Sequence, residues 1–108
     1  MAKFICLVSY TTEGLRQINI TTKRAGAFTK RVEQLGGRVL ATYWTLGIYD
    51  IVHIIEAENA KVAASLAMSL GSLGNVKTHT MVAFSLEEMQ NDILKNIQNP
   101  YDLLNVDM

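Results

Sequence analysis

The sequence predicts an α+β fold, in which a four-stranded antiparallel sheet carries two helices on one face and a further helix follows at the C-terminal end. Runs with the two-residue period of strands alternate with longer runs of helical period, in the order β-α-β-β-α-β. Glycines stand where both helical runs finish, at 36–37 and at 71 and 74. The chain has 108 residues, of which 49% are apolar, and this length fits one domain.

The first third of the chain predicts a strand, a loop and a helix. Residues 3–10 place apolar side chains on both alternating faces, which is typical of a central strand. Residues 11–20 predict a polar loop or short turn around Gly14. A helix is expected up to residue 35, with Thr21 or Thr22 as its N-cap. Its buried stripe would be Ala25, Phe28, Val32 and Leu35.

The remaining chain predicts a hairpin, a second helix, a fourth strand and a third helix. Strands are expected at 38–45 and 49–57, joined through about three residues that include Gly47. A helix at 60–73, capped by Glu58 or Asn59, is rich in small residues that would permit close packing on the sheet. A fourth strand is expected at 75–84. A capping box at 85–88 starts a last helix that Pro100 ends.

This order of elements, joined by right-handed crossovers, gives the ferredoxin-like arrangement with both helices on one face of the sheet. The opposite face would then be an exposed apolar surface. Pairing with a second copy would cover it and produce a dimeric α+β barrel. We therefore expect self-association, with a ligand site in the space between the two sheets.

Composition narrows the classes of partner. Ten Lys and Arg balance ten Asp and Glu, which argues against a nucleic acid or an anionic membrane as partner. The single Cys6 cannot form an internal disulfide, and the N-terminal residues do not resemble a signal peptide, so a cytoplasmic protein is expected. Residues 1–98 form the expected domain. Residues 99–108 form a tail expected to dock through its large apolar side chains, which are Tyr101, Leu103, Leu104 and Val106.

The segment YWTLGIYD at residues 43–50 resembles the signature of the GYD-domain family, which is named after a Gly-x-Tyr-Asp motif in this hairpin. The resemblance continues in register over residues 3–90, through motifs at 13–14, 23–25, 36–37, 56–57, 71–76, 78–80 and 83–84. It implies a ferredoxin-like domain of the dimeric barrel type and transfers fold better than function. The chain departs from the family at Val82, where arginine is frequent, and at His53 and His79, so no ligand role carries over to these histidines.

Four aromatic residues on the expected strands are candidates for stacking a flat or apolar ligand: Tyr10, Tyr43, Trp44 and Tyr49. The alternative is that they fill the core and a subunit interface. Tyr43 and Trp44 are adjacent and cannot both face one cavity.

Polar candidates each have a structural alternative. Asp50 is a candidate base or cation ligand, or an acceptor for backbone N–H groups in the turn. Arg24 in the first turn of a helix suggests an anionic partner, because the macrodipole there disfavours a cation. His53 is a candidate acid or base, and Thr78 or Thr80 would add polar groups to the pocket. No ligand spacing for a metal is present, and neither a metal nor a cofactor is expected.

Three classes of function remain open from the sequence. The first is a protein that binds or senses a small molecule in a pocket between subunits. The second is an enzyme of the cofactor-free oxygenase type acting on a flat aromatic substrate, with His53, His79 or Asp50 as the titratable group. The third is a purely structural assembly domain with no cavity. These three functions can be distinguished by the volume of any cavity and by the directions in which Tyr43, Trp44 and His53 point.

Overall fold

The computed structural model describes residues 1–101, which form one sheet, two long helices and a set of short helical segments. The elements follow in this order: β1 (Ala2–Tyr10), α1 (Thr12–Arg16), η1 (Ile18–Ile20), α2 (Thr21–Gln34), β2 (Arg38–Trp44), β3 (Ile51–Ala57), α3 (Ala60–Ser72), β4 (Val76–Ala83), α4 (Leu86–Glu88), η2 (Met89–Ile93) and η3 (Leu94–Asn96).

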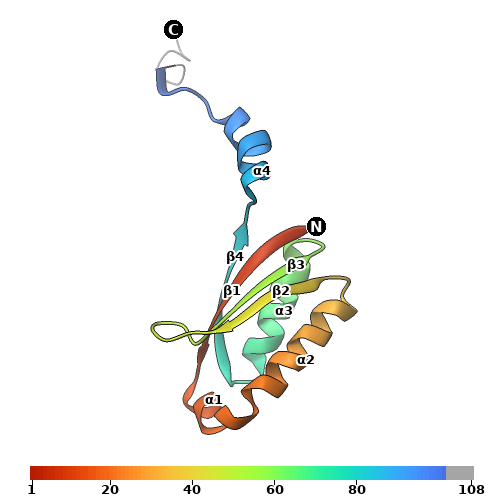
Figure 1. Ribbon diagram of the computed structural model, residues 1–108, viewed down its shortest axis with the longest axis vertical. Coiled ribbons are helices and arrows are strands. Elements are labelled where there is room, and N and C mark those ends of the chain that lie inside the picture. Colours follow the sequence, from red (N-terminus) through yellow and green to blue (C-terminus); the bar gives the residue numbers. More distant parts are fainter. Residues whose placement is uncertain (102–108) are drawn as a thin grey trace.

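The four strands form one antiparallel sheet in the order β2-β3-β1-β4. Figure 1 shows α2 and α3 side by side on one face of this sheet, while the other face carries no helix. The predicted ferredoxin-like fold is therefore confirmed. The right-handed β-α-β crossovers put both long helices on the same face.

The core lies between the sheet and the two helices. Alternate residues of β1 and β3 point to this face and are buried because successive side chains of a strand alternate between faces. From the helices, Phe28 and Val32 of α2 and Leu66 of α3 pack against them. The main members of this cluster are Phe4, Cys6, Phe28, Val32, Ile55, Ala57, Ala63 and Leu66.

Two local expectations need correction. Residues 12–16 form a short helix, α1, in which Thr11 accepts a hydrogen bond from the N–H of Gly14, rather than a plain loop. Neither threonine caps α2, because Thr21 is already its first helical residue and Ile20 holds the cap position without a side-chain bond. The glycine stop is confirmed: Gly36 has φ of 83°, a left-handed conformation that glycine adopts at little cost.

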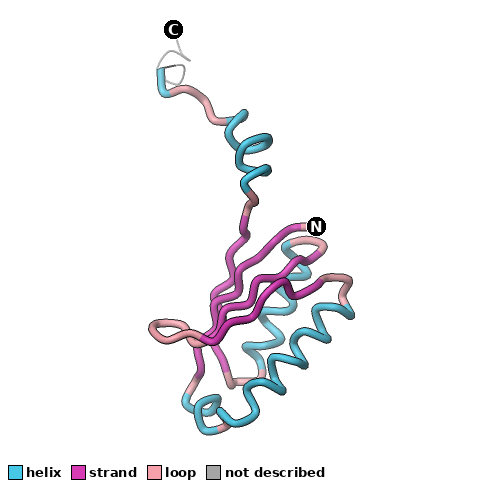
Figure 2. The backbone as a smooth tube through the Cα atoms, viewed as in Figure 1, coloured by secondary structure: helices cyan, strands magenta, loops and turns pink. Residues whose placement is uncertain are grey.

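The β2–β3 connection is longer than expected, spanning residues 45–50. Figure 2 shows it as a loop that projects past the sheet. Its two ends are joined by a hydrogen bond of 2.8 Å from the N–H of Thr45 to the carbonyl of Asp50, and Thr45 Oγ1 donates to the carbonyl of Tyr49 at 2.6 Å. These bonds hold the loop closed without extending the strands.

The C-terminal helical segment starts as predicted and then changes character. Ser85 and Glu88 form the capping box, each side chain bonded to the other's backbone N–H. After α4 the chain continues as the π-type turn η2 and the 3₁₀ turn η3, ending at Asn96 before Pro100 is reached. Figure 1 shows this segment standing away from the sheet and the long helices. The tail residues Leu103, Leu104 and Val106, expected to dock, lie outside the described residues.

Candidate functional site

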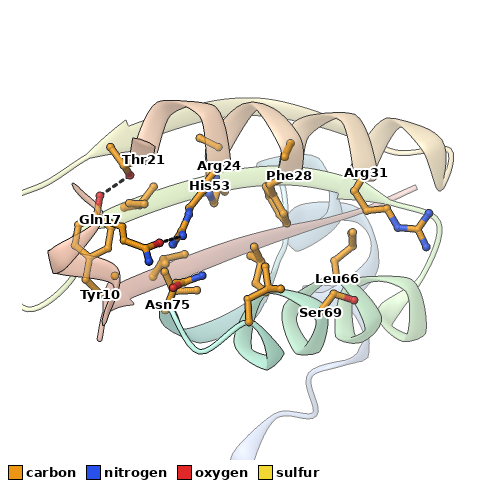
Figure 3. A pocket seen from close by; sticks show the side chains of 18 residues that line it. Tyr10, Gln17, Thr21, Arg24, Phe28, Arg31, His53, Leu66, Ser69 and Asn75 are labelled. Carbon is orange, nitrogen blue, oxygen red and sulfur yellow. Dashed lines mark hydrogen bonds between the residues drawn. The ribbon is translucent and has the colours of Figure 1, made fainter. Parts of the chain in front are cut away.

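A cavity of about 230 Å³ lies between α2, α3 and the helix-bearing face of the sheet. Figure 3 shows its side chains converging from both helices, from β1 and β3, and from the α1 segment. Its interior is mostly apolar, and polar groups stand at particular points around it. The main apolar lining residues are Val8, Phe28, Ile51, Leu66, Leu70 and Val76, and the main polar ones are Tyr10, Gln17, Thr21, Arg24, Arg31, His53, Ser69 and Asn75.

Each of the two helices contributes small side chains to the lining of the cavity. Ala25 and Ala27 of α2 face it from one side, and Ser69 of α3 faces it from the other. At its end, Gly14 packs so tightly on the backbone that an added Cβ would lie 2.1 Å from the carbonyl oxygen of Asn75. Of the small residues of α3 that were expected to pack closely on the sheet, Ser69 lines the cavity, together with the larger Leu66 and Leu70.

His53 is the polar residue at the base of the cavity. It is 3% exposed, its Nδ1 shares a hydrogen bond of 2.9 Å with Oγ1 of Thr42, and its ring lies tilted by 36° against Phe28 at 4.6 Å between centroids. Burial lowers the pKa of His53 to about 4, because the charged form loses its hydration. The imidazole is therefore neutral at pH 7 and offers a hydrogen bond rather than a charge.

Three side chains tie β1, β2 and the start of α2 together beside the cavity. The hydroxyls of Tyr10 and Thr21 share a hydrogen bond of 2.6 Å. The indole N–H of Trp44 donates to both, at 3.2 Å to Tyr10 and 3.1 Å to Thr21. Tyr10 and Thr21 line the cavity, whereas Trp44 bonds to them without lining it. The choice left open by the sequence is thus decided: Trp44 turns toward the helix side and Tyr43 does not.

Two arginines lie on the cavity lining, and their side chains point in different directions. The Arg24 guanidinium donates a hydrogen bond to Oε1 of Gln17, and Figure 3 shows it extending from α2 toward that residue. The Arg31 guanidinium donates to Gln34 at 3.2 Å, and the figure places it at the other end of the labelled set. Ion pairs among residues 1–101 involve Arg16 and Arg38, but neither lining arginine.

Asp50 makes hydrogen bonds to the backbone of the neighbouring strand, β1. Its Oδ2 accepts the N–H of Tyr10 at 2.8 Å, and its own N–H donates to the carbonyl of Val8 at 2.8 Å. It thus continues the β1–β3 pairing past Ile51 with a side chain in place of a backbone acceptor. The acceptor role expected within the turn exists, but the donor belongs to β1.

The open face of the sheet carries two apolar rows. Paired residues of adjacent strands share a face, so the register places Val52 of β3 between Tyr43 of β2 and Leu7 of β1. The second row places Ile54 next to Ile5, which in turn pairs with Met81. Tyr43 is 61% exposed and Met81 47% exposed. We call this surface the open face, defined by Ile5, Leu7, Ala41, Tyr43, Val52, Ile54 and Met81.

The remaining candidates are spread over other parts of the sheet. Tyr49 lies edge-on to His79 at 5.7 Å, and His79 pairs with Leu7 on the open face. Thr80 pairs with Cys6 on the helix side but does not line the cavity. Burial raises the pKa of the Cys6 thiol, which a weaker hydrogen bond to Thr80 opposes. Cys6 is therefore an unreactive core residue at neutral pH.

Among residues 1–101, no group of three His, Cys, Asp or Glu side chains is placed to hold a metal ion. Within the same part of the chain, the helices are all too short or too polar to cross a membrane.

The predicted site residues therefore divide between two surfaces. The cavity brings together Tyr10, Arg24 and His53, with Trp44 beside them, while Tyr43 lies on the open face and Asp50 and Thr80 lie on neither. The sequence analysis expected a ligand site between two sheets and did not expect the cavity under the helices. The signals that the sequence offers are Ala25 and Ala27 on α2 and Ser69 on α3, and they are weak because leucines form the rest of the α3 lining.

Comparison with known proteins identifies the family. The sequence profile of the GYD domain matches residues 4–93. A protein of Thermus thermophilus, named glutamine synthetase and cystathionine beta-lyase binding protein, is 34% identical over 90 residues, which cover 82% of this chain and 95% of that protein.

A solved structure has the same fold. The crystal structure of TTHA0845 from Thermus thermophilus aligns with a TM-score of 0.51 and 21% identity, covering 79% of this chain and 95% of that chain. At this level of identity the likeness concerns the fold alone.

Proposed function

Because the chain belongs to the GYD domain family, we propose that it is a binding protein that holds a small molecule in the interhelical cavity and pairs with a second copy through the open face. The cavity carries the proposal. Ligand sites in proteins are concave and mostly apolar, with a few polar groups that orient the ligand. The interhelical cavity has this composition, and its polar groups are neutral His53, Tyr10 and the rim arginine Arg24.

The volume bounds the size of the ligand. At about 230 Å³ the cavity is smaller than the roughly 300 to 1,000 Å³ of sites for drug-sized molecules. A small metabolite with a single ring or a branched aliphatic group fits this range. The site lies within one subunit, in contrast to the pocket between sheets expected from the sequence.

Native mass spectrometry of the protein as purified, compared with the denatured mass, tests both parts of the proposal. We expect an even number of subunits and an extra mass of a small molecule per subunit. Ser69→Phe places a ring into the cavity and should abolish the extra mass. Met68→Phe is the matched control, since Met68 is 74% exposed on the same helix and does not line the cavity.

Absence of extra mass would not by itself end the test, because a weakly held ligand is lost on purification. The two variants would then be compared for binding of added compounds. Equal binding by Ser69→Phe and Met68→Phe would contradict the cavity as the site.

A second candidate function is the binding of other proteins, favoured by the open face. The relative from Thermus thermophilus is named for binding glutamine synthetase and cystathionine beta-lyase. Exposed apolar patches such as the open face mark protein interaction surfaces. Sedimentation of this protein with each purified enzyme tests the idea. Co-sedimentation that Val52→Lys abolishes would support it, and separate sedimentation of all components would contradict it.

A further inference from the structure

The charged residues that line the cavity are all positive. Its lining contains two arginines and no aspartate or glutamate among the residues that the structure describes. The nearest carboxylate on the α1 segment, Glu13, accepts a hydrogen bond from Gln17 at 3.1 Å and pairs with Arg16 at 3.6 Å. Its charge is thus matched by Arg16, and no ion pair among residues 1–101 involves the guanidinium of Arg24.

The contact that Arg24 makes is a replaceable one. Its partner, Oε1 of Gln17, is a neutral amide oxygen, and both residues line the cavity. The present bond has one charged partner, the guanidinium, whereas a carboxylate would add the second charge and can accept two parallel N–H bonds from arginine. A carboxylate entering the cavity would therefore compete with Gln17 for Arg24.

The position of Arg24 adds to this preference. It lies in the first turn of α2, which contains no acidic residue and has no side-chain cap at Ile20. The positive end of the helix macrodipole therefore adds to the positive potential of the guanidinium. The cavity lining continues from Arg24 to the apolar side chains of Phe28 and Leu66 (Figure 3).

From this arrangement we propose that the ligand is a small organic acid, with one carboxylate on Arg24 and an apolar or aromatic body against Phe28, His53 and Leu66. This inference rests on the proposed small-molecule site and names its ligand class. One guanidinium reaches into this end of the cavity, since that of Arg31 lies at the other end. A single negative charge is therefore matched, whereas a phosphate dianion would lack a second cation. His53 is neutral and supplies no further positive charge.

The protein contains its own reporter. Trp44 is the single tryptophan of the chain, and its indole N–H bonds to Tyr10 and Thr21 of the cavity lining. Occupation of the cavity should alter these bonds and hence the fluorescence of Trp44. Nitrogen–proton correlation spectra of the labelled protein serve as a second readout for a ligand that leaves the fluorescence unchanged.

The test titrates four compounds that share a phenyl body and differ in the polar group: phenylacetate, phenyl phosphate, 2-phenylethanol and 2-phenylethylamine. We expect phenylacetate to bind about tenfold or more tightly than 2-phenylethanol, the amine to bind worst, and phenyl phosphate to fall below phenylacetate. Arg24→Gln should weaken phenylacetate about tenfold and leave 2-phenylethanol unchanged. Lys23→Gln, which removes the same charge from an exposed position of the same helix outside the lining, should change phenylacetate binding less than about threefold.

A further variant keeps the inference testable if Arg24→Gln does not fold. Gln17→Glu places a carboxylate on Arg24 from within the chain, and it should weaken phenylacetate while sparing 2-phenylethanol. Equal binding of acid and alcohol, or equal losses in Arg24→Gln and Lys23→Gln, would overturn the acid assignment and leave the cavity as a binding site. A preference for phenyl phosphate would overturn the carboxylate in favour of phosphate. Failure of all four compounds to bind would contradict the proposed site itself, and the acid assignment with it.

Discussion

The two faces of the sheet carry similar apolar side chains and differ in what covers them. On the helix side, Phe4 and Ile55 are almost completely buried beneath α2 and α3. One residue further along each strand, Ile5 and Ile54 point to the open face and are only half-buried. The same strands thus supply a core on one side and an uncovered apolar surface on the other.

The difference shows that the helices of the chain bury only one of the two faces of the sheet. Alternation of side chains makes both faces apolar, but both long helices lie on the same side because of the handedness of the crossovers. An apolar surface left by topology is stabilised when a second molecule covers it. The comparison can be tested by substitutions that affect one face only.

The largest expected effect is in the covered core. Phe4→Ala should lower the free energy of unfolding by about 3 to 5 kcal/mol, because it leaves a cavity among fully buried neighbours. Ile5→Ala, one position away on the open face, should cost about 1 kcal/mol at low protein concentration. Urea unfolding followed by circular dichroism measures both, and equal losses would contradict the two-face description.

The second expected effect is a pH dependence of stability, which arises from His53 on the helix-covered face of the sheet. The pKa of His53 is lowered by burial to about 4 from an ordinary value of 6.5, so the unfolded chain binds a proton in this range that the folded chain does not. Stability should be fully present above about pH 6.5 and should fall by roughly 3 kcal/mol as the pH drops to about 4.

Paired variants isolate this contribution. Urea unfolding at several pH values should show a flatter slope for His53→Gln than for the unaltered protein. His79→Gln should retain the slope, since His79 is exposed on the open face. If His53→Gln and the unaltered protein change in parallel with pH, the assignment to His53 is wrong.

The third effect concerns the open face and self-association. Val52→Lys places a charge in the middle of an apolar row, where burial against a second copy would be costly. We expect association to weaken about a hundredfold or more, as measured by light scattering over a range of concentrations. Leu46→Lys, in the fully exposed β2–β3 loop, is the control and should retain the assembly. An unchanged mass for Val52→Lys would argue against pairing through this face.

The smallest effect tests the role of Asp50. Asp50→Ala should lower the free energy of unfolding by about 1 to 2 kcal/mol, because the N–H of Tyr10 loses its 2.8 Å partner at the end of the β1–β3 pairing. Ligand binding in the cavity should persist, since Asp50 is not part of the lining. Asp92→Ala, an exposed change in the C-terminal segment, is the control. Loss of binding with unchanged stability would instead assign Asp50 to a ligand.

Local patterns in the sequence predicted the strands, the two long helices and the caps of α3 and α4, but not α1 or the cap of α2. Asn59 caps α3 by accepting from the N–H of Val62, and Ser85 with Glu88 forms the capping box. Such interactions involve residues three apart, which the sequence displays directly. The partner of Asp50 could not be predicted because it lies on β1, 40 residues away, and that of Arg24 could not because Gln17 lies on the irregular turn between α1 and η1.

The orientation of Tyr43 and Trp44 shows most clearly what the tertiary structure decided. The pairing of β2 with β3 shifts between Val39 and Ala41, and this irregularity at Leu40 moves every later residue of β2 to the opposite face. Continued alternation from Val39 would have turned Tyr43 toward the helices and Trp44 outward. Strand periodicity in the sequence determines that the two side chains lie on opposite faces, but the register between strands assigns the faces.

The same division holds for the cavity. The sequence by itself showed that α2 and α3 contain several small residues. It also showed that His53 lies in phase with Ile51 and Ile55 on β3. Only the packing of the two helices on the sheet left the space between them, buried His53 and brought Arg24 to its rim. Secondary structure arises from contacts between near neighbours, whereas a cavity is a property of how distant elements fit together.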